Sequence, residues 1–158
     1  MQNFTARQLR DACGAFATGV TVVTARAAAG GVGITANSFA SLSLDPPMVM
    51  WAPARRSARF DTFTTAEHFT IHILNAEQKT LAGDFARSGD DPFSTHPWTE
   101  GPYGVPEFQG CAALFRCRLH AVYPGGDHAI VVGAVESLSH DPHPHPLVFH
   151  AGLYPRLA

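Results

Sequence analysis

Apolar and polar residues alternate with a period of two along much of the chain, and this alternation indicates β-strands. Between residues 113 and 123, apolar side chains alternate with Arg116, Arg118 and His120, which is typical of a half-exposed antiparallel strand. The other apolar runs are rich in β-branched residues. The strands that they predict are residues 20–27, 32–37, 48–52, 69–74, 128–139 and 147–150.

A helical pattern replaces the alternation in three places, and the first and last of these predicted helices begin with a capping box. In this motif a Thr or Asn is followed three residues later by Gln, as at residues 5–8 and 75–78. We expect the first helix to end near Gly19. The last should bury Leu81 and Phe85 on its inner face.

Turn residues connect the predicted strands into hairpins. Gly30 and Gly31 should join the first two strands, and residues 124–127, PGGD, should join the two long ones. Residues 90–110 contain four prolines and no periodicity, which indicates a long functional or covering loop. Six or seven strands joined mostly by hairpins, with three flanking helices, predict an α+β fold. We expect a mainly antiparallel barrel formed by one domain, residues 1–158.

Composition excludes several classes of protein. The 158 residues carry a net charge of −2 and include one lysine, Lys79, which does not favour a nucleic-acid or anionic-membrane partner. No signal peptide or membrane span is evident. Cys13, Cys111 and Cys117 are an odd number and show no C-x-x-C spacing, so we expect reduced thiols in a cytoplasmic protein.

The most informative stretch is residues 33–51, GITANSFASLSLDPPMVMW. It begins and ends as a strand, but its centre is a run of small hydroxyl and amide residues. Because these residues have little bulk, the backbone together with Asn37, Ser38, Ser41 and Ser43 can lie directly against a flat polar ligand. We therefore expect the ligand site to be built around this stretch.

The dinucleotide fingerprint G-x-G-x-x-A is matched by Gly31, Gly33 and Ala36, but the residues that follow do not favour the helix that this fingerprint needs. That fingerprint requires a helix directly afterwards, whereas Asn, Ser and Phe follow here, ahead of Pro46 and Pro47. A Rossmann fold is therefore not favoured. The chain also lacks GxxxxGK[ST], GxSxG and HExxH, the motifs of phosphate-binding loops, serine hydrolases and zinc proteases.

Arg55, Arg56 and Arg59 lie within five residues, at the predicted start of a helix that Ser57 can cap. Guanidinium groups beside a helix N-terminus favour an anion, most naturally a phosphate. The alternative is a solvated charged turn.

Two groups of histidines have competing interpretations. His128 follows Gly-Gly-Asp at the start of a strand, where it is either a site residue or an ordinary surface residue of a turn. The tract HDPHPH, residues 140–145, has a metal-binding composition. Because prolines flank two of its histidines, convergent ligand geometry is hard to form. We therefore expect no metal.

Six blocks occur in order: FATGVTVVTA, GITANSFASLSLDPP, RSARF, FARSGDDPF, GGDHAIVVG and FHAGLY. In this combination the chain closely resembles the flavin reductase family, the small NAD(P)H:flavin oxidoreductase components of two-component monooxygenases. The resemblance extends from about Phe4 to Leu157. It implies the FMN-binding split barrel, a homodimer with the flavin near the subunit interface, and a separate oxygenase as partner.

The resemblance also implies roles for particular residues. His128 would lie near the nicotinamide, and Tyr154 would border the same pocket. Arg55 and Arg56 stand where many relatives carry a second Ser or a neutral residue, so they are alternative phosphate contacts. The residues implied for the flavin ring and ribityl chain are Thr35, Ala36, Asn37, Ser38, Ser41, Leu42 and Ser43, those for the phosphate are Ser57 and Arg59, and those for the segment that closes over the flavin are Phe85 and Arg87.

The implied activity is reduction of FMN or FAD by NADH or NADPH, with release of the diffusible reduced flavin. Hydride transfer needs positioning rather than a nucleophile, so the absence of a catalytic triad is expected. One alternative is a non-catalytic flavin or haem binding module of the same barrel, which would not require the Gly-Asp-His block. Another is a reductase of a different acceptor, such as a cobalamin or ferric complex.

Overall fold

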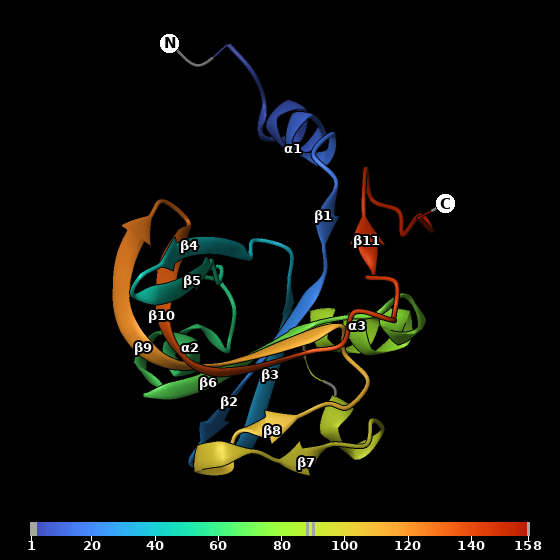
Figure 1. Cartoon of the computed structure of the whole chain (residues 1–158). Coiled ribbons are helices and arrows are strands. Elements are labelled where there is room, and N and C mark those ends of the chain that lie inside the picture. The colour runs from blue at the N-terminus through green and yellow to red at the C-terminus, as the bar shows by residue number, and fades with distance from the viewer. Residues whose placement is uncertain (1–2, 88, 90, 158) are drawn as a thin grey trace.

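A curved antiparallel sheet dominates the computed structural model, which describes residues 3–87, 89 and 91–157. Its strand order is β3-β2-β6-β9-β10-β5-β4. Figure 1 shows β9 and β10 as long, strongly bent ribbons that connect β4 and β5 to the rest of the sheet. The bounds are β2 (Thr21–Ala27), β3 (Gly30–Ala36), β4 (Ala40–Leu44), β5 (Pro47–Trp51), β6 (His68–Ile73), β9 (Ala113–Gly125) and β10 (His128–His140).

The bend of β10 has a local cause. Its register against β9 shifts after Val132 and again after Val135, and such bulges increase the curvature of a strand. Gly133 lies at the first shift, where a Cβ atom would stand 2.6 Å from Cζ of Phe69. The missing side chain therefore lets the bent strand lie directly on the core. The fold is the expected α+β, mainly antiparallel arrangement of the split-barrel type.

Short elements and helices surround this sheet. The N-terminal helix α1 stands away from the body in Figure 1, whereas α3 lies against it. No helix in the described ranges is long and apolar enough to cross a membrane. The bounds are α1 (Ala6–Gly14), α2 (Phe60–Thr65), α3 (Lys79–Ala86), the 3₁₀ turns η1 (Ala76–Gln78), η2 (Pro92–Ser94) and η3 (Pro102–Gly104), and the short strands β1 (Thr18–Gly19), β7 (Thr99–Glu100), β8 (Pro106–Glu107) and β11 (Val148–Phe149).

Both predicted capping boxes form. Thr5 and Asn75 accept the expected backbone hydrogen bonds, and the Gln residue of each motif bonds back to the cap. The predicted end of the first helix was wrong, because α1 ends at Gly14 and not near Gly19. Residues 18–19 instead pair with β11 as a short strand.

Four other local predictions need correction. Gly30 and Gly31 belong to β3, and the hairpin turn is formed by residues 28–29. Residues 40–44, which were not among the predicted strands, form the edge strand β4 because their backbone pairs with β5. Ser57 does not cap α2, whose N-cap position is Arg59. The long segment after α3 contains η2, η3 and the β7–β8 pair instead of being a plain loop.

The core has two parts. One, around Trp51, Phe63 and Phe69, fills the curve of the sheet. The other, around Leu81 and Phe85, packs α3 against the sheet. Burial of such apolar surface is the main favourable term in folding.

The two glycines of the dinucleotide-like pattern serve packing in the second core cluster. A Cβ atom on Gly33 would lie 2.4 Å from Cε1 of Phe85, and one on Gly31 would lie 2.6 Å from Cγ of Pro106. Because neither glycine has a side chain, the Phe85 ring and the segment before β9 approach the backbone of β3 closely. This packing accounts for the glycines without a Rossmann turn.

Buried polar contacts fix the segment before β9 to the sheet. His72 is fully buried, and burial lowers its pKa to about 4, so the ring is neutral near pH 7. Its Nδ1 lies 2.9 Å from the carbonyl oxygen of Val22, and its Nε2 accepts from the N–H of Phe108 at 3.2 Å. Nδ1 therefore carries the proton. Arg116 also donates to the buried Glu107 at 2.6 and 2.7 Å.

Candidate functional site

The polar stretch lies where β3 ends and the chain crosses to β4. The Thr35 hydroxyl donates to the carbonyl of Ala82 on α3 at 2.6 Å. The carbonyl of Ala36 accepts from the Thr21 hydroxyl at 2.7 Å. The Ser38 hydroxyl accepts from the N–H of Ala52 at 2.9 Å. These contacts fix the end of β3 from three sides, so the connecting backbone is rigidly positioned.

A cavity of about 190 Å³ opens beside this strand end. The ring of Tyr154 forms one wall and packs edge-on against Phe149 at 5.5 Å. The ammonium group of Lys79 lies 5.3 Å from the centre of the Tyr154 ring. The structure therefore brings the C-terminal segment next to the polar stretch, and the cavity is lined by Val20, Thr35, Ala36, Asn37, Phe149 and Tyr154.

The rest of the polar stretch forms β4. A register irregularity lies between Ser41 and Ser43, and Leu42 between them has no partner in the β4–β5 register. The side chain of Leu42 is half exposed. Strand β4 is at the edge of the sheet, so one side of its backbone faces away from β5.

The arginine-rich segment bridges two other elements. The Arg59 guanidinium donates to the carbonyl of Phe85 at 3.0 Å and to that of Arg87, at the C-terminal end of α3. Partial burial lowers the pKa of Arg59. At the other end, Arg55 donates through Nε to the carbonyl of Gly126 in the β9–β10 turn. The Ser57 hydroxyl accepts from the N–H of Arg59 at 3.2 Å.

Phe85 and Arg87 differ in exposure. The Phe85 ring is buried in the core, so only its backbone carbonyl is near Arg59. The Arg87 side chain is exposed and forms an ion pair with Asp84. The second carboxylate oxygen of Asp84 lies 2.6 Å from Nε2 of His96.

His128 lies at the opposite end of the arginine-rich segment from α3. Its Nδ1 is 2.7 Å from Oδ1 of Asp127, and the residue forms an isolated bridge with Ala54. The hydrogen bond from His128 holds the pKa of the Asp127 carboxyl below its usual range. The ring is partly exposed at the end of the hairpin, where it can contact a ligand.

The structure therefore gathers the expected residues into separate groups. Thr35, Ala36, Asn37 and Tyr154 share one cavity. Arg59 contacts Phe85, Arg87 and Ser57. The resemblance assigns His128 and Tyr154 to one pocket, but within this chain His128 is not among the residues that line the Tyr154 cavity.

Sequence reasoning missed Lys79, Asp84 and His96. Lys79 is the only lysine of the chain, and this was a signal that could have drawn attention to it. Asp84 and His96 are 12 residues apart across an aperiodic segment, so no spacing rule connects them.

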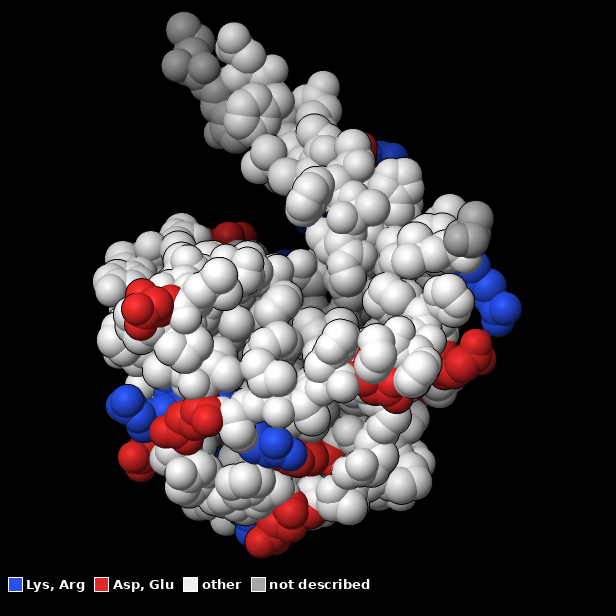
Figure 2. Space-filling model, in the orientation of Figure 1, with Lys and Arg blue, Asp and Glu red and all other residues white. Residues whose placement is uncertain are grey.

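The described residues show neither an extended basic surface in the view of Figure 2 nor a group of side chains that could bind a metal. On the face shown in Figure 2, acidic and basic side chains lie in small mixed groups instead of an extended basic stripe. Within the described part of the chain, no three His, Cys, Asp or Glu side chains are grouped so that they can hold a metal. His143 and His145 line a separate cavity of about 430 Å³ with Arg156.

Residues 13–158 match the family described as the flavin reductase like domain. The chain is 46% identical over 152 residues to the FMN reductase (NADH) SmoA of Agrobacterium fabrum, covering 96% of this chain and 86% of that protein. It is 46% identical over 134 residues to the reductase component of the flavin-dependent trigonelline monooxygenase of Acinetobacter baylyi, covering 84% of this chain but 43% of that protein. It thus spans less than half of that second relative.

Solved structures show the same similarity. The NADH:FAD oxidoreductase SgcE6 of Streptomyces globisporus superposes with a TM-score of 0.92 at 37% identity. The match covers 96% of this chain and 92% of that one.

Proposed function

The chain belongs to the flavin reductase like family, and from this we propose that it reduces FMN or FAD with NADH or NADPH and supplies the reduced flavin to a separate oxygenase. Relatives are named as reductase components of monooxygenases that act on trigonelline and 4-hydroxyphenylacetate. The observation that carries the proposal is the cavity where the fixed end of β3 meets Tyr154. It presents backbone and small polar groups beside an aromatic wall, which suits a flat polar ring.

The arginine-rich segment fits the flavin phosphate. Arg59 is held between α2 and the end of α3, and two of its five N–H donors contact the carbonyls of Phe85 and Arg87. The fork is thus fixed in place with its charge retained, as bidentate phosphate recognition requires. Arg87 and the Ser57 hydroxyl are nearby contributors.

When both nucleotides are bound, the nicotinamide supplies a hydride that the flavin accepts. Thr35, Ala36, Asn37 and Ser38, at the end of β3, would hold the flavin ring, and Ser41, Leu42 and Ser43 on β4 would contribute further contacts. His128, oriented by Asp127, positions the nicotinamide. These residues supply distance and orientation and need not move a proton.

The test of this function is oxidation of NADH or NADPH followed at the nicotinamide absorbance band. We expect the absorbance to fall only after FMN or FAD is added. A flat trace with every pairing of nucleotide and flavin would instead support a non-catalytic binder.

The role of His128 has a separate test. His128→Ala should raise the apparent KM for NAD(P)H and slow flavin reduction, and it should leave flavin affinity within about twofold. Stopped-flow reduction and a flavin titration measure the two effects. Unchanged reduction kinetics would make His128 an ordinary turn residue.

We also propose that the protein is a homodimer, and the main support is helix α1. None of its residues is buried, and the exposed fractions are 50% for Leu9 and 77% for Phe16, which lies just after the helix. A nine-residue helix has little stability without packing, so a second copy that covers its apolar face would stabilise it. Light scattering at micromolar concentration should give twice the monomer mass. A monomer would contradict this proposal.

The cysteines support a cytoplasmic location. All three are free, and burial raises the pKa of Cys111 to about 11 and that of Cys117 to about 12. Burial therefore keeps these two thiols protonated near neutral pH. An odd number of cysteines without C-x-x-C spacing suits a reducing compartment, and this supports the proposed location.

A further inference from the structure

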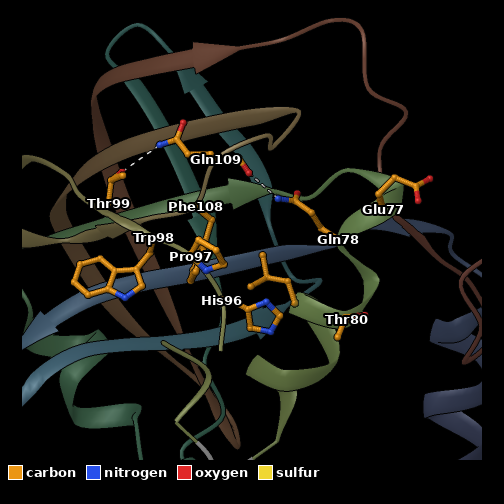
Figure 3. Close-up of a pocket in the computed structure, with 10 residues that line it drawn as sticks. Glu77, Gln78, Thr80, His96, Pro97, Trp98, Thr99, Phe108 and Gln109 are labelled. Carbon is orange, nitrogen blue, oxygen red and sulfur yellow. Dashed lines mark hydrogen bonds between the residues drawn. The ribbon is translucent and has the colours of Figure 1, made fainter. Parts of the chain in front are cut away.

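A second cavity, of about 390 Å³, lies between the start of α3 and the segment before β9, and Thr35 is not among the residues that line it. Figure 3 shows its walls: Gln78 and Thr80 come from η1 and α3, and His96, Trp98 and Gln109 come from the segment before β9. Its volume is within the range of small-molecule sites, about 300–1,000 Å³. Nothing in the flavin site as described above uses this cavity, which we call the Trp98 cavity.

The Trp98 cavity combines an aromatic surface with hydrogen-bonding groups. The indole of Trp98 is 37% exposed although its ring packs edge-on against Phe93 at 5.9 Å. Gln109 donates through Nε2 to the hydroxyl of Thr99 at 3.2 Å. This arrangement directs the Gln109 oxygen to accept and the Thr99 hydroxyl hydrogen to donate elsewhere. A planar ring with both donor and acceptor edges therefore matches the cavity.

The charges around the Trp98 cavity limit the chemical class of ligand that it could bind. The lining contains no Lys or Arg, and its one carboxylate, Glu77, is on the exposed rim 3.7 Å from Arg156. A phosphate would lack a cation here, whereas an uncharged base would not need one. Adenine is planar and uncharged and has an amino donor beside ring-nitrogen acceptors, so it fits both the aromatic and the polar parts.

The Trp98 cavity connects to the proposed phosphate site through a short series of contacts. His96, in its wall, bonds to one oxygen of Asp84, and the other oxygen pairs with Arg87. The Arg87 carbonyl in turn accepts from Arg59. Asp84 and His96 therefore lie between Arg87, which could face a phosphate, and the uncharged Trp98 cavity, which could hold a base.

We propose that the Trp98 cavity binds the adenine of FAD, with its phosphates toward Arg59 and Arg87. This inference rests on the proposed flavin reductase function and adds a preference for FAD over FMN to it. Asp84 and His96 act as positioning residues between the two ends. A free adenine nucleotide has the same base and is the competing source.

The experiment compares FAD and FMN affinities by calorimetry for the wild type and two variants. Trp98→Ala removes the stacking surface and should weaken FAD about tenfold while leaving FMN within about twofold. Gln109→Leu keeps the side chain near its original size and should weaken FAD by a smaller factor. Tyr103→Ala is the matched control, because Tyr103 is an exposed aromatic of the same segment outside the cavity, and it should change neither affinity.

Three results would overturn the assignment. These are equal losses of FAD and FMN in Trp98→Ala, unchanged FAD affinity in both variants, or a wild type that binds the two flavins equally. In a fluorescence titration, AMP should quench Trp98, since the other tryptophan, Trp51, is fully buried, and FAD should displace it. AMP that binds without competing with FAD would assign the cavity to a free nucleotide instead.

Failure of this inference is distinguishable from failure of the proposed function. A wild type that oxidises NADH with FMN or FAD, but shows none of the adenine effects, contradicts only the cavity assignment. A wild type that oxidises NADH with neither flavin contradicts the proposed function itself.

Discussion

Helices α1 and α3 have the same sequence signal before them, but one is exposed and the other is packed in the core. Both follow a capping box, formed by Thr5 and Gln8 before α1 and by Asn75 and Gln78 at the turn before α3. Helix α3 buries Leu81, Ala82 and Phe85, whereas α1 buries no residue. The local signal for a helix is therefore independent of the surface on which the helix packs.

The two helices also differ in their relation to the candidate sites. Helix α3 contacts β3 through Thr35, holds Arg59 at its end and forms a wall of the Trp98 cavity, so its packing determines the geometry of both sites. Among the described residues, helix α1 makes none of these contacts, and its Gly14 carbonyl accepts only from the N–H of Ala151 at 3.0 Å. In the proposed homodimer, the second copy would cover its apolar face. Mutations in the two helices should consequently affect different measurements.

The largest difference in unfolding free energy should be between variants of Phe85 in α3 and of Phe16 beside α1. Phe85→Ala leaves a cavity in the core against Gly33 and should lower the free energy of unfolding by about 3–5 kcal/mol. Phe16→Ala, just after α1, removes an exposed ring and should cost less than about 0.5 kcal/mol within the monomer. Urea denaturation measures both. Similar losses for both variants would mean that α1 packs within its own chain.

The C-terminal end of α3 offers the next contrast. Arg59→Ala removes the donor to the Phe85 carbonyl and the proposed phosphate contact, so FMN should weaken more than riboflavin, by about 1.5–3 kcal/mol or ten- to a hundredfold. Any effect on α3 itself is common to the two flavins and cancels in their ratio.

Fluorescence titration with each flavin gives that ratio. Arg118→Ala, a remote arginine paired with Glu136, is the control and should leave it unchanged. Equal weakening of FMN and riboflavin by Arg59→Ala would move the phosphate site to Arg55 or Arg56.

Glycine substitutions next to the two helices should differ in the same direction, with a smaller loss of unfolding free energy. Gly33→Ala places a Cβ atom 2.4 Å from the Phe85 ring on which α3 packs, and such overpacking should cost about 1–3 kcal/mol of unfolding free energy. Gly14→Ala in α1 meets only an ordinary contact, 3.7 Å from Cα of Ala151, and should be neutral or stabilising. Thermal unfolding followed by circular dichroism would test the pair, and a destabilising Gly14→Ala would contradict this account.

The smallest effects should come from the caps. Asn75→Ala should cost about 1 kcal/mol of unfolding free energy, because η1 and α3 belong to the cooperative core. Thr5→Ala should reduce helical signal with almost no change in the unfolding midpoint of the monomer, because α1 frays separately. Equal shifts in the midpoint would show that α1 unfolds together with the core.

The sequence by itself determined the features that depend on neighbouring residues. Both capping boxes, the alternation of β9 and the inner face of α3 were predicted correctly, because these signals act over a few residues. The turn before His128 was predicted two residues too long, since Pro124 and Gly125 belong to β9 and the turn is residues 126–127. The family resemblance added the function and named the expected site residues, whose roles remain proposals.

Only the tertiary structure decided how distant segments meet. Thr35 bonds to Ala82 across 47 residues, and Thr24 bonds to the carbonyl of Pro106 across 82. The pairing of β4 with β5, the burial of the Phe85 ring over Gly33 and the Asp84–His96 contact likewise depend on which surfaces come together. Periodicity describes the faces of each element but not their partners, since burial and long-range hydrogen bonds are properties of the folded chain as a whole.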